Sequence, residues 1–366
     1  MMIGIIAILK ICFSKQNGKI PLNSTLVYLF LGTWIIYQTL VNFLFAQNIT
    51  RSNSVTVWIV LGLFISFYIV KNPNSSQEII SYSLIFACFN SISSFLVWLL
   101  AVKKVLPETV GYQIDPIYGD IGVFVSTYEA NIFAGLVTVW SLIAMTEYGF
   151  ILPKKFRLLL IYIAPVVCLL AATRTALLIW VIGVLFLLIS KQNWRIFSFL
   201  CFVTLISVIF SQIIKDYKTI AISEKFTSVF VSLNQALSYR IETWRIALDD
   251  LRSESFLSHG YGMNAFPDMH LDPSQRKLGL GRFLGNIFLQ ILYSGGLVSL
   301  FFVLMAILVI LNYRRSKNGF IIFGAYTLLS LITSTLWLAQ TWIFLGLALA
   351  TPKQKSDNHF LSTNRI

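Results

Sequence analysis

The stretch Leu284–Leu311 reads LGNIFLQILYSGGLVSLFFVLMAILVIL and contains no charged side chain. A helix of about 20 apolar residues is long enough to cross the hydrocarbon of a bilayer, and this stretch exceeds that length. The rest of the chain has the same character, since 57% of its residues are hydrophobic, 12% are charged, and its mean hydropathy is +0.77. These values exclude a soluble globular protein and predict an all-α, polytopic transmembrane helical bundle.

Similar apolar stretches recur along the chain and predict further spans. They are continuously apolar instead of alternating, so they favour helices over the strands of a barrel. About 10–12 spans are expected, and about eleven if the last stretch turns back as two short helices. The expected spans cover residues 1–13, 25–46, 55–70, 79–102, 130–147, 157–172, 175–189, 194–212, 284–311 and 320–350.

One long polar segment interrupts this pattern, and the chain divides around it. The segment holds nine basic and eight acidic residues, and chemistry outside the bilayer is expected there. The expected parts are N-terminal transmembrane helices over 1–212, an extracytoplasmic loop over 213–283, C-terminal transmembrane helices over 284–350 and a cytoplasmic tail over 351–366.

Lysine and arginine collect in short links between the spans, and this predicts an orientation. Because basic residues gather in cytoplasmic loops, we place these links inside and the segments 47–54, 103–129 and 213–283 outside. The net charge of +13 has the same explanation, and no nucleic acid partner is expected. The basic positions are Lys15, Lys19, Lys154, Lys155, Arg157, Lys191, Arg195, Arg314, Arg315 and Lys317.

An amphipathic helix is expected inside the long loop. Its apolar residues recur at helical spacing and form one narrow stripe, so the helix should lie on the membrane surface or pack on the bundle. The stripe consists of Leu237, Ile241, Trp244, Leu248 and Leu251.

The arginines of this helix are expected at the borders of the apolar stripe, and its acidic residues further away from the stripe. Arg240 borders one side and Arg245 the other, while Asp249 and Asp250 should point away from the packed face. After the helix, two glycines at 260 and 262 should end regular structure and allow a close approach of backbone.

Arginines on the outer side are the candidate binding groups. Arg174 lies in a very short link between two expected spans, so its guanidinium stays at the interface or faces the bundle. Because the planar guanidinium donates two parallel hydrogen bonds, converging arginines would form a site for a pyrophosphate. In the alternative interpretation, the arginines snorkel to headgroups or pair with Asp249 and have only a structural role.

Several segments of the expected outer face resemble the O-antigen ligase and polymerase superfamily. Thr173–Leu178 (TRTALL) resembles its Ser-Arg-x-x segment, and Arg240-x-x-x-Trp244 followed by Gly-x-Gly at 260–262 resembles its large extracytoplasmic loop. Residues 286–297 are similar to the start of its next span, and residues 122–131 to an earlier outward segment. The resemblance covers residues 115–310.

The resemblance implies a metal-independent, inverting glycosyltransferase of the membrane-embedded GT-C-like class, without a cofactor, in the bacterial plasma membrane. Its donor would be an undecaprenyl-diphosphate-linked oligosaccharide, and membrane lipids and a chain-length regulator would be further partners. Arg174 and Arg240 would bind the diphosphate leaving group, with His259 as a third catalytic residue. The substrate-binding residues would be Arg245, Trp244, Gly260, Gly262, Asn286, Glu129 and Asn131.

One position departs from the family pattern. Ligases usually have a histidine immediately before the asparagine that corresponds to Asn286, and this chain has Gly285 there. His259 and His270 could replace that histidine only in the sense that they are the same residue type. We therefore favour a polymerase that joins lipid-linked repeats of O-antigen, capsule or exopolysaccharide. The alternatives are a ligase that transfers glycan to a lipid A core or other acceptor, a transporter or flippase, and an assembly subunit without activity. The scarcity of acidic residues within spans and the lack of a visible repeat argue against the transporter.

Overall fold

The structure is a computed structural model that describes residues 22–107, 110–114, 121–125, 130–171, 173–191, 240–253, 258–270, 284–312, 317–331 and 338–350. Within this part of the chain, four helices are long and apolar enough to cross a membrane. They are α2 (Leu22–Phe45), α3 (Ile49–Lys71), α4 (Pro73–Val102) and α14 (Ile287–Asn312). The expected all-α membrane fold is thus confirmed.

Shorter helices occupy the other expected spans in the described ranges. The stretch 320–350 forms two helices that pack against each other, as the two-helix alternative required. The expected spans 1–13 and 194–212 lie outside the described residues. The shorter helical elements are α5 (Ala130–Ala144), α6 (Lys154–Leu170), α7 (Arg174–Lys191), α15 (Lys317–Ser330) and α16 (Ala339–Leu349), with the 3₁₀ turn η1 (Glu147–Ile151) in the link between α5 and α6.

Local capping signals set the ends of the first long helices. The Asn48 side chain accepts a hydrogen bond from the Arg51 backbone N–H at 3.0 Å, which satisfies one of the unpaired donors at the start of α3. Pro73 lies in the first turn of α4, where the missing N–H costs nothing. Asn72 caps the end of α3 and directly precedes Pro73, so α3 and α4 are joined by a very short turn.

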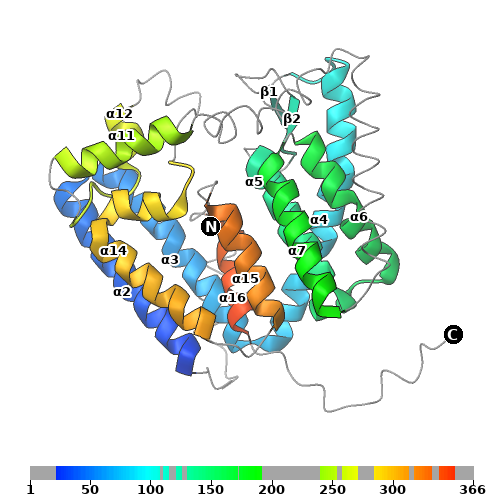
Figure 1. The fold of residues 1–366 in the computed structure, drawn as a ribbon, viewed down its shortest axis with the longest axis horizontal. Coiled ribbons are helices and arrows are strands. Elements are labelled where there is room, and N and C mark those ends of the chain that lie inside the picture. The colour runs from blue at the N-terminus through cyan, green and yellow to red at the C-terminus, as the bar shows by residue number, and fades with distance from the viewer. Residues whose placement is uncertain are drawn as a thin grey trace.

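The helices form two packed groups with α15 and α16 between them (Figure 1). In one group every residue of α5 except Asn131 is buried, because α5 is surrounded by α4, α6, α7 and α15. In the other group α2 packs on α3 and α14, and α3 packs on α16. Large apolar side chains of α2 such as Leu29 and Ile36 are exposed, as expected of a surface that faces lipid.

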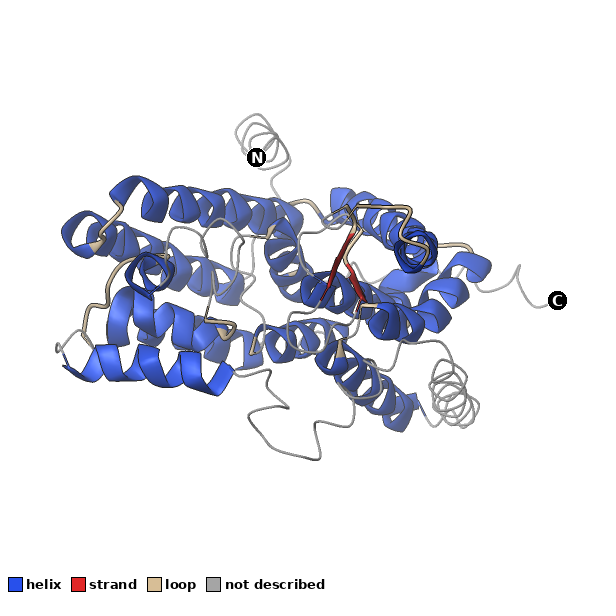
Figure 2. Cartoon of the chain, turned by 90° about the horizontal axis from the view of Figure 1, so that it is seen from above, coloured by secondary structure: helices blue, strands red, loops and turns tan. Residues whose placement is uncertain are grey.

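A short antiparallel hairpin, β1 (Tyr112–Ile114) and β2 (Ile121–Val123), lies in the link between α4 and α5. The described spans contain helices only, and in Figure 2 this strand pair is the exception to a helical structure. The hairpin lies at the same end of the molecule as the loop helices α11 (Arg240–Ser253) and α12 (Ala265–His270) (Figure 1). The segments expected outside the membrane therefore gather at one end.

Candidate functional site

A small cap covers one end of the group formed by α2, α3 and α14. We call it the loop cap, and it consists of α11, residues 258–270 with α12, and residues 284–294 with the first part of α14. In Figure 1, α11 lies across the ends of the long helices. The cap has an apolar core of its own, formed by Ala247, Leu251, Tyr261, Ala265, Phe266, Leu284 and Tyr293.

The expected span 284–311 does not run as one regular helix, because its backbone breaks at two glycines. Gly295 has φ −142° and ψ 17°, and Gly296 has φ 65° and ψ −164°, a conformation that is essentially restricted to glycine. The break separates the cap part of α14 from the part that descends into the bundle.

The Gly-x-Gly segment of the loop packs directly on this break. The backbone N–H groups of Tyr261 and Gly262 donate to the carbonyls of Tyr293 and Ser294, at 2.9 and 2.8 Å. A Cβ atom on Gly260, which has φ 71°, would lie 2.5 Å from the backbone nitrogen of residue 295. The close backbone approach expected of the two glycines is confirmed, and their role in substrate binding stays a prediction.

A buried polar network fixes the cap to α2 and α3. The Asn42 side chain donates to Asn53 at 3.1 Å and Thr56 at 2.9 Å, and its oxygen accepts from the backbone N–H of Met263 at 2.8 Å. Gln38 donates to the carbonyl of residue 294 at 3.0 Å, next to the glycine break. These bonds satisfy groups that would be costly to bury alone.

A salt bridge adds a second attachment between α12 and α3. Arg51 Nη1 lies 2.7 Å from Asp268 Oδ1, and the Asp268 side chain is 7% exposed. The expected outward segment 47–54 therefore touches the long loop, and the two lie at the same end of the bundle.

The start of α14 explains the structural roles of two predicted binding residues. The Asn286 side chain accepts from the backbone N–H groups of Phe288 and Leu289 at 3.0 and 3.1 Å, so it caps the helix. Trp244 Nε1 donates to the carbonyl of Leu284 at 2.6 Å and holds α11 against this start. Binding of substrate by either residue stays a prediction.

Gly285 has a backbone conformation that disfavours a side chain. Its φ is +66°, in the left-handed region, where other L-residues are strained. The resemblance to ligases implies a histidine at this position, and a residue with a Cβ would be strained at this φ.

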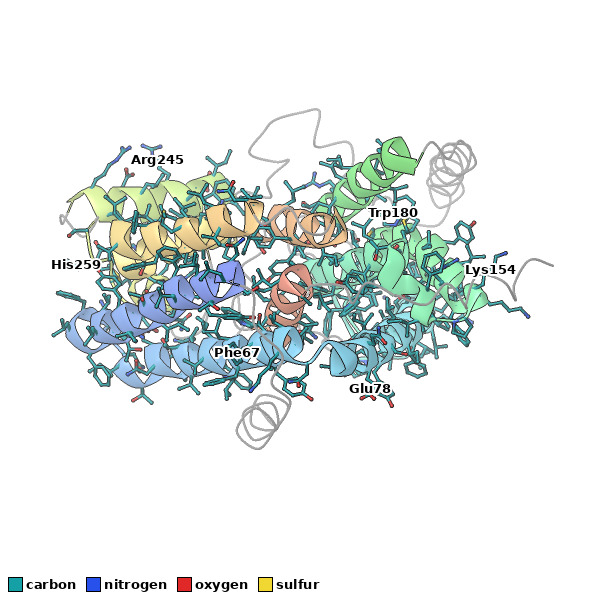
Figure 3. The ribbon with its side chains drawn as sticks, turned by 90° about the horizontal axis from the view of Figure 1, so that it is seen from below. Phe67, Glu78, Lys154, Trp180, Arg245 and His259 are labelled. Atoms are coloured by element: carbon teal, nitrogen blue, oxygen red, sulfur yellow. The ribbon has the colours of Figure 1, made fainter. Side chains whose placement is uncertain are left out.

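The remaining predicted cap residues differ in exposure. Arg240 begins α11 and is half-buried, whereas the Arg245 side chain is 83% exposed, with its Nε 3.8 Å from Asp249 Oδ2. The His259 ring stacks on Phe45 at 4.0 Å, and its Nδ1 lies 2.9 Å from the carbonyl of the next residue. Figure 3 shows Arg245 and His259 toward one end of the long axis and Trp180 of α7 toward the other.

The expected orientation of α11 is wrong at two positions. Leu248, expected in the apolar stripe, is 38% exposed, and Asp250, expected to point away, lies at the packed face with a 20% exposed side chain. The reason is that α12 and the first part of α14 supply polar partners to this helix as well as apolar ones. Residues 237–239, where the stripe was expected to start, lie outside the described residues.

Asp250 is the centre of a polar cluster that sequence reasoning missed. Its Oδ2 lies 2.6 Å from His270 Nε2 and accepts from the Tyr293 hydroxyl at 2.8 Å. Its backbone carbonyl accepts from the Tyr261 hydroxyl at 2.9 Å. No local spacing signals this cluster, because its members, Asp250 included, come from three separate segments.

A second group of predicted residues lies in the other helix group. Arg174 begins α7 and is half-buried, and the hydroxyl of the buried Thr173 donates to Asn131 Oδ1 at 3.4 Å. The segment around Arg174 and the outward segment that ends at Asn131 therefore meet at the start of α5 and α7. Glu129 lies outside the described residues.

An apolar cavity lies between α2, α14, α15 and α16, beside the cap part of α14. Its lining includes Trp34, Ile291, Ile307, Tyr326 and Trp342. The buried Trp34 Nε1 has no hydrogen-bond partner among the described residues. In the same described ranges, no three His, Cys, Asp or Glu side chains are grouped so that they could hold a metal ion.

The comparison with protein families matches residues 158–303 to the family described as O-antigen ligase. The matched range begins in α6, includes Arg174 and the loop cap, and ends in α14. The comparison with curated proteins finds no match. The family implies a glycosyltransferase-like enzyme that acts on lipid-linked glycan in polysaccharide assembly, and together with the apolar helices it suggests a bacterial inner membrane protein. This domain supports the placement of the chain in an O-antigen ligase/polymerase-like superfamily.

Proposed function

We propose that the protein is a polymerase that joins undecaprenyl-diphosphate-linked oligosaccharide repeats at the outer face of the plasma membrane. The observation that carries this proposal is Gly285 at φ +66°, directly before the helix cap Asn286, within a domain of the ligase family. Asn286 of the third motif is present in this chain and caps α14. The backbone conformation of the preceding residue, Gly285, suits glycine better than histidine.

The donor site is formed from both helix groups. Arg174 at the start of α7 and Arg240 at the start of α11 bind the diphosphate and stabilise the charge that develops when the glycosidic bond breaks. Arginine suits this role because its fork matches phosphate oxygens without a metal ion. The apolar cavity beside the cap is a suitable place for the first isoprene units of the carrier.

The transfer is inverting and needs no metal. The acceptor hydroxyl attacks the anomeric carbon from the face opposite the diphosphate, and the electron pair of the broken bond leaves with the phosphate oxygen. A leaving group that two arginines already stabilise lowers the demand on the nucleophile.

A paired cysteine experiment tests the proposed location. Asp249→Cys on α11, where the native side chain is 60% exposed, should react with a membrane-impermeant maleimide in intact spheroplasts. Lys154→Cys, at an exposed position in a basic link, should react only after lysis. The reverse pattern would place the cap inside the cell and would remove the basis of the proposal.

The activity is tested by deletion of the gene and analysis of surface glycan on gels. A polymerase deletion should leave single repeats and lose the ladder of longer chains, and the gene on a plasmid should restore the ladder. The ligase alternative, which the description of the matched family favours, predicts a different result. In that case long carrier-linked ladders persist, but no glycan reaches the final acceptor.

A further inference from the structure

An acid–histidine pair within the loop cap has the geometry of an oriented base. His270, at the end of α12, places Nε2 2.6 Å from Asp250 Oδ2 on α11. An ionised carboxylate only accepts hydrogen bonds, so Nε2 is assigned the proton and Nδ1 becomes the basic nitrogen. The pair is partly accessible, with side chains 28% and 20% exposed.

Neighbouring aromatic residues hold this pair in place. The Tyr293 hydroxyl donates to the same Asp250 oxygen at 2.8 Å, so the carboxylate is fixed from a second side. The Phe266 ring lies 4.8 Å from the His270 ring and limits its rotation. A carboxylate that orients an imidazole also stabilises the imidazolium that forms when the ring takes a proton.

The other loop histidine is placed differently. His259 stacks on Phe45, and its Nδ1 lies 2.9 Å from the neutral carbonyl of Gly260, whereas His270 Nε2 faces the Asp250 carboxylate. The Asp250 pair therefore suits a general base better than the residue that sequence reasoning selected.

We propose that His270 is the general base for the acceptor hydroxyl, in the role that the missing histidine at position 285 has in ligases. This inference rests on the proposed polymerase function. His270 Nδ1 takes the hydroxyl proton as the hydroxyl oxygen bonds to the anomeric carbon of the donor. The bond from that carbon to the phosphate oxygen breaks, and its electron pair leaves with the diphosphate. The imidazolium then releases its proton to water, and Asp250 positions the ring throughout.

The test uses the full-length protein in liposomes with a lipid-linked repeat, and wild-type turnover is measured first. His270→Gln keeps a donor for Asp250 but has no basic nitrogen, so kcat should fall by about 100-fold or more while the donor KM changes by less than about threefold. His270→Ala should recover at least about tenfold of its lost activity in added imidazole, because a free base can replace the missing one.

A matched control separates this role from simple attachment of α12. Asp268→Asn, on the same helix as His270, removes the charge that pairs with Arg51 of α3 but removes no base, so any activity it loses should not be restored by imidazole. If His270→Gln stays within about threefold of wild type, or if His270→Ala shows no imidazole response, His270 is not the base. Inactivity of the wild-type protein would instead overturn the proposed function.

Discussion

The two helix groups hold their candidate site residues by different means. Around α5, apolar side chains such as Leu142 and Trp180 form a continuous buried core, and the half-buried Arg174 begins α7, which contributes to that core. The loop cap is fixed to α2 and α3 by buried amides and a salt bridge, and its loop segment is joined to α14 by backbone hydrogen bonds beside the glycine break. Many apolar substitutions of similar volume should be tolerated in the first group, whereas the second depends on individual polar atoms and on residues without a side chain.

The largest effect is expected at Arg174 and Arg240, the two arginines that we propose bind one diphosphate. Arg174→Ala and Arg240→Ala should each lower the turnover of lipid-linked repeats by roughly 30- to 1,000-fold, about 2–4 kcal/mol of transition-state stabilisation. Arg→Lys should restore little activity, because a point charge does not reproduce the planar fork.

Arg252→Ala provides the control for these variants, since Arg252 is exposed near the end of α11 and should change turnover by less than about threefold. Normal glycan chains from well-expressed Arg174→Ala and Arg240→Ala proteins would show that the diphosphate binds elsewhere.

A smaller effect is expected from a methyl group at the glycine break. Gly296→Ala should destabilise the protein by about 3 kcal/mol, because its φ of 65° suits only glycine and a Cβ would overlap the carbonyl of Ser258. Gly324→Ala on α15 is the control, because no atom lies within 4 Å of the position that its Cβ would take, and the helix should gain stability if anything. Thermal unfolding in detergent measures both, and equal midpoints would contradict the close packing of the loop on α14.

Removal of the central amide of the polar network should loosen the cap alone. Asn42→Ala leaves the backbone N–H of Met263 without its acceptor, at a cost of about 1–3 kcal/mol. Hydrogen exchange should increase in residues 258–270 and stay unchanged in α5. Thr39→Ala, one turn earlier on α2, removes only a bond to its own helix and is the control. Faster exchange throughout α5 would show that the two groups do not behave separately.

The smallest effect concerns the departure from the ligase pattern. Gly285→His should cost about 1–2 kcal/mol of stability, because φ +66° strains a residue that carries a side chain, and it should not create transfer to a non-glycan acceptor. Gly285→Asn should cost less, since asparagine tolerates the left-handed region better. Transfer of glycan to a lipid acceptor by Gly285→His would show that the ligase site is otherwise complete.

The contrast between the groups also explains what the sequence could predict. Long apolar runs form helices wherever backbone groups must be satisfied within a membrane, so the sequence predicts α3 and α4, and Asn48 and Pro73 set their ends. The cap is harder to predict because its partners are distant in sequence: Asp250 bonds to residues 20 and 43 positions away. Periodicity alone places this carboxylate on the wrong face of α11.

The break in α14 illustrates the same limit. Two adjacent glycines weaken a helix, but only the loop segment that packs against them makes the break necessary. For the site, the sequence alone identifies Arg174, Arg240 and Asn286 as candidate residues. The contacts that these side chains make can be read only from the folded structure. The capping role of Asn286 depends on where α14 starts.

The most direct test of the central claim is turnover by purified protein in liposomes that contain a synthetic undecaprenyl-diphosphate-linked repeat and excess EDTA. We predict a ladder of lengthening chains that stay attached to the carrier, with free diphosphate carrier released at each step. Activity that chelation abolishes and magnesium or manganese restores would contradict the metal-independent mechanism. Transfer of chains from the carrier to a non-glycan acceptor, without any ladder, would contradict polymerisation.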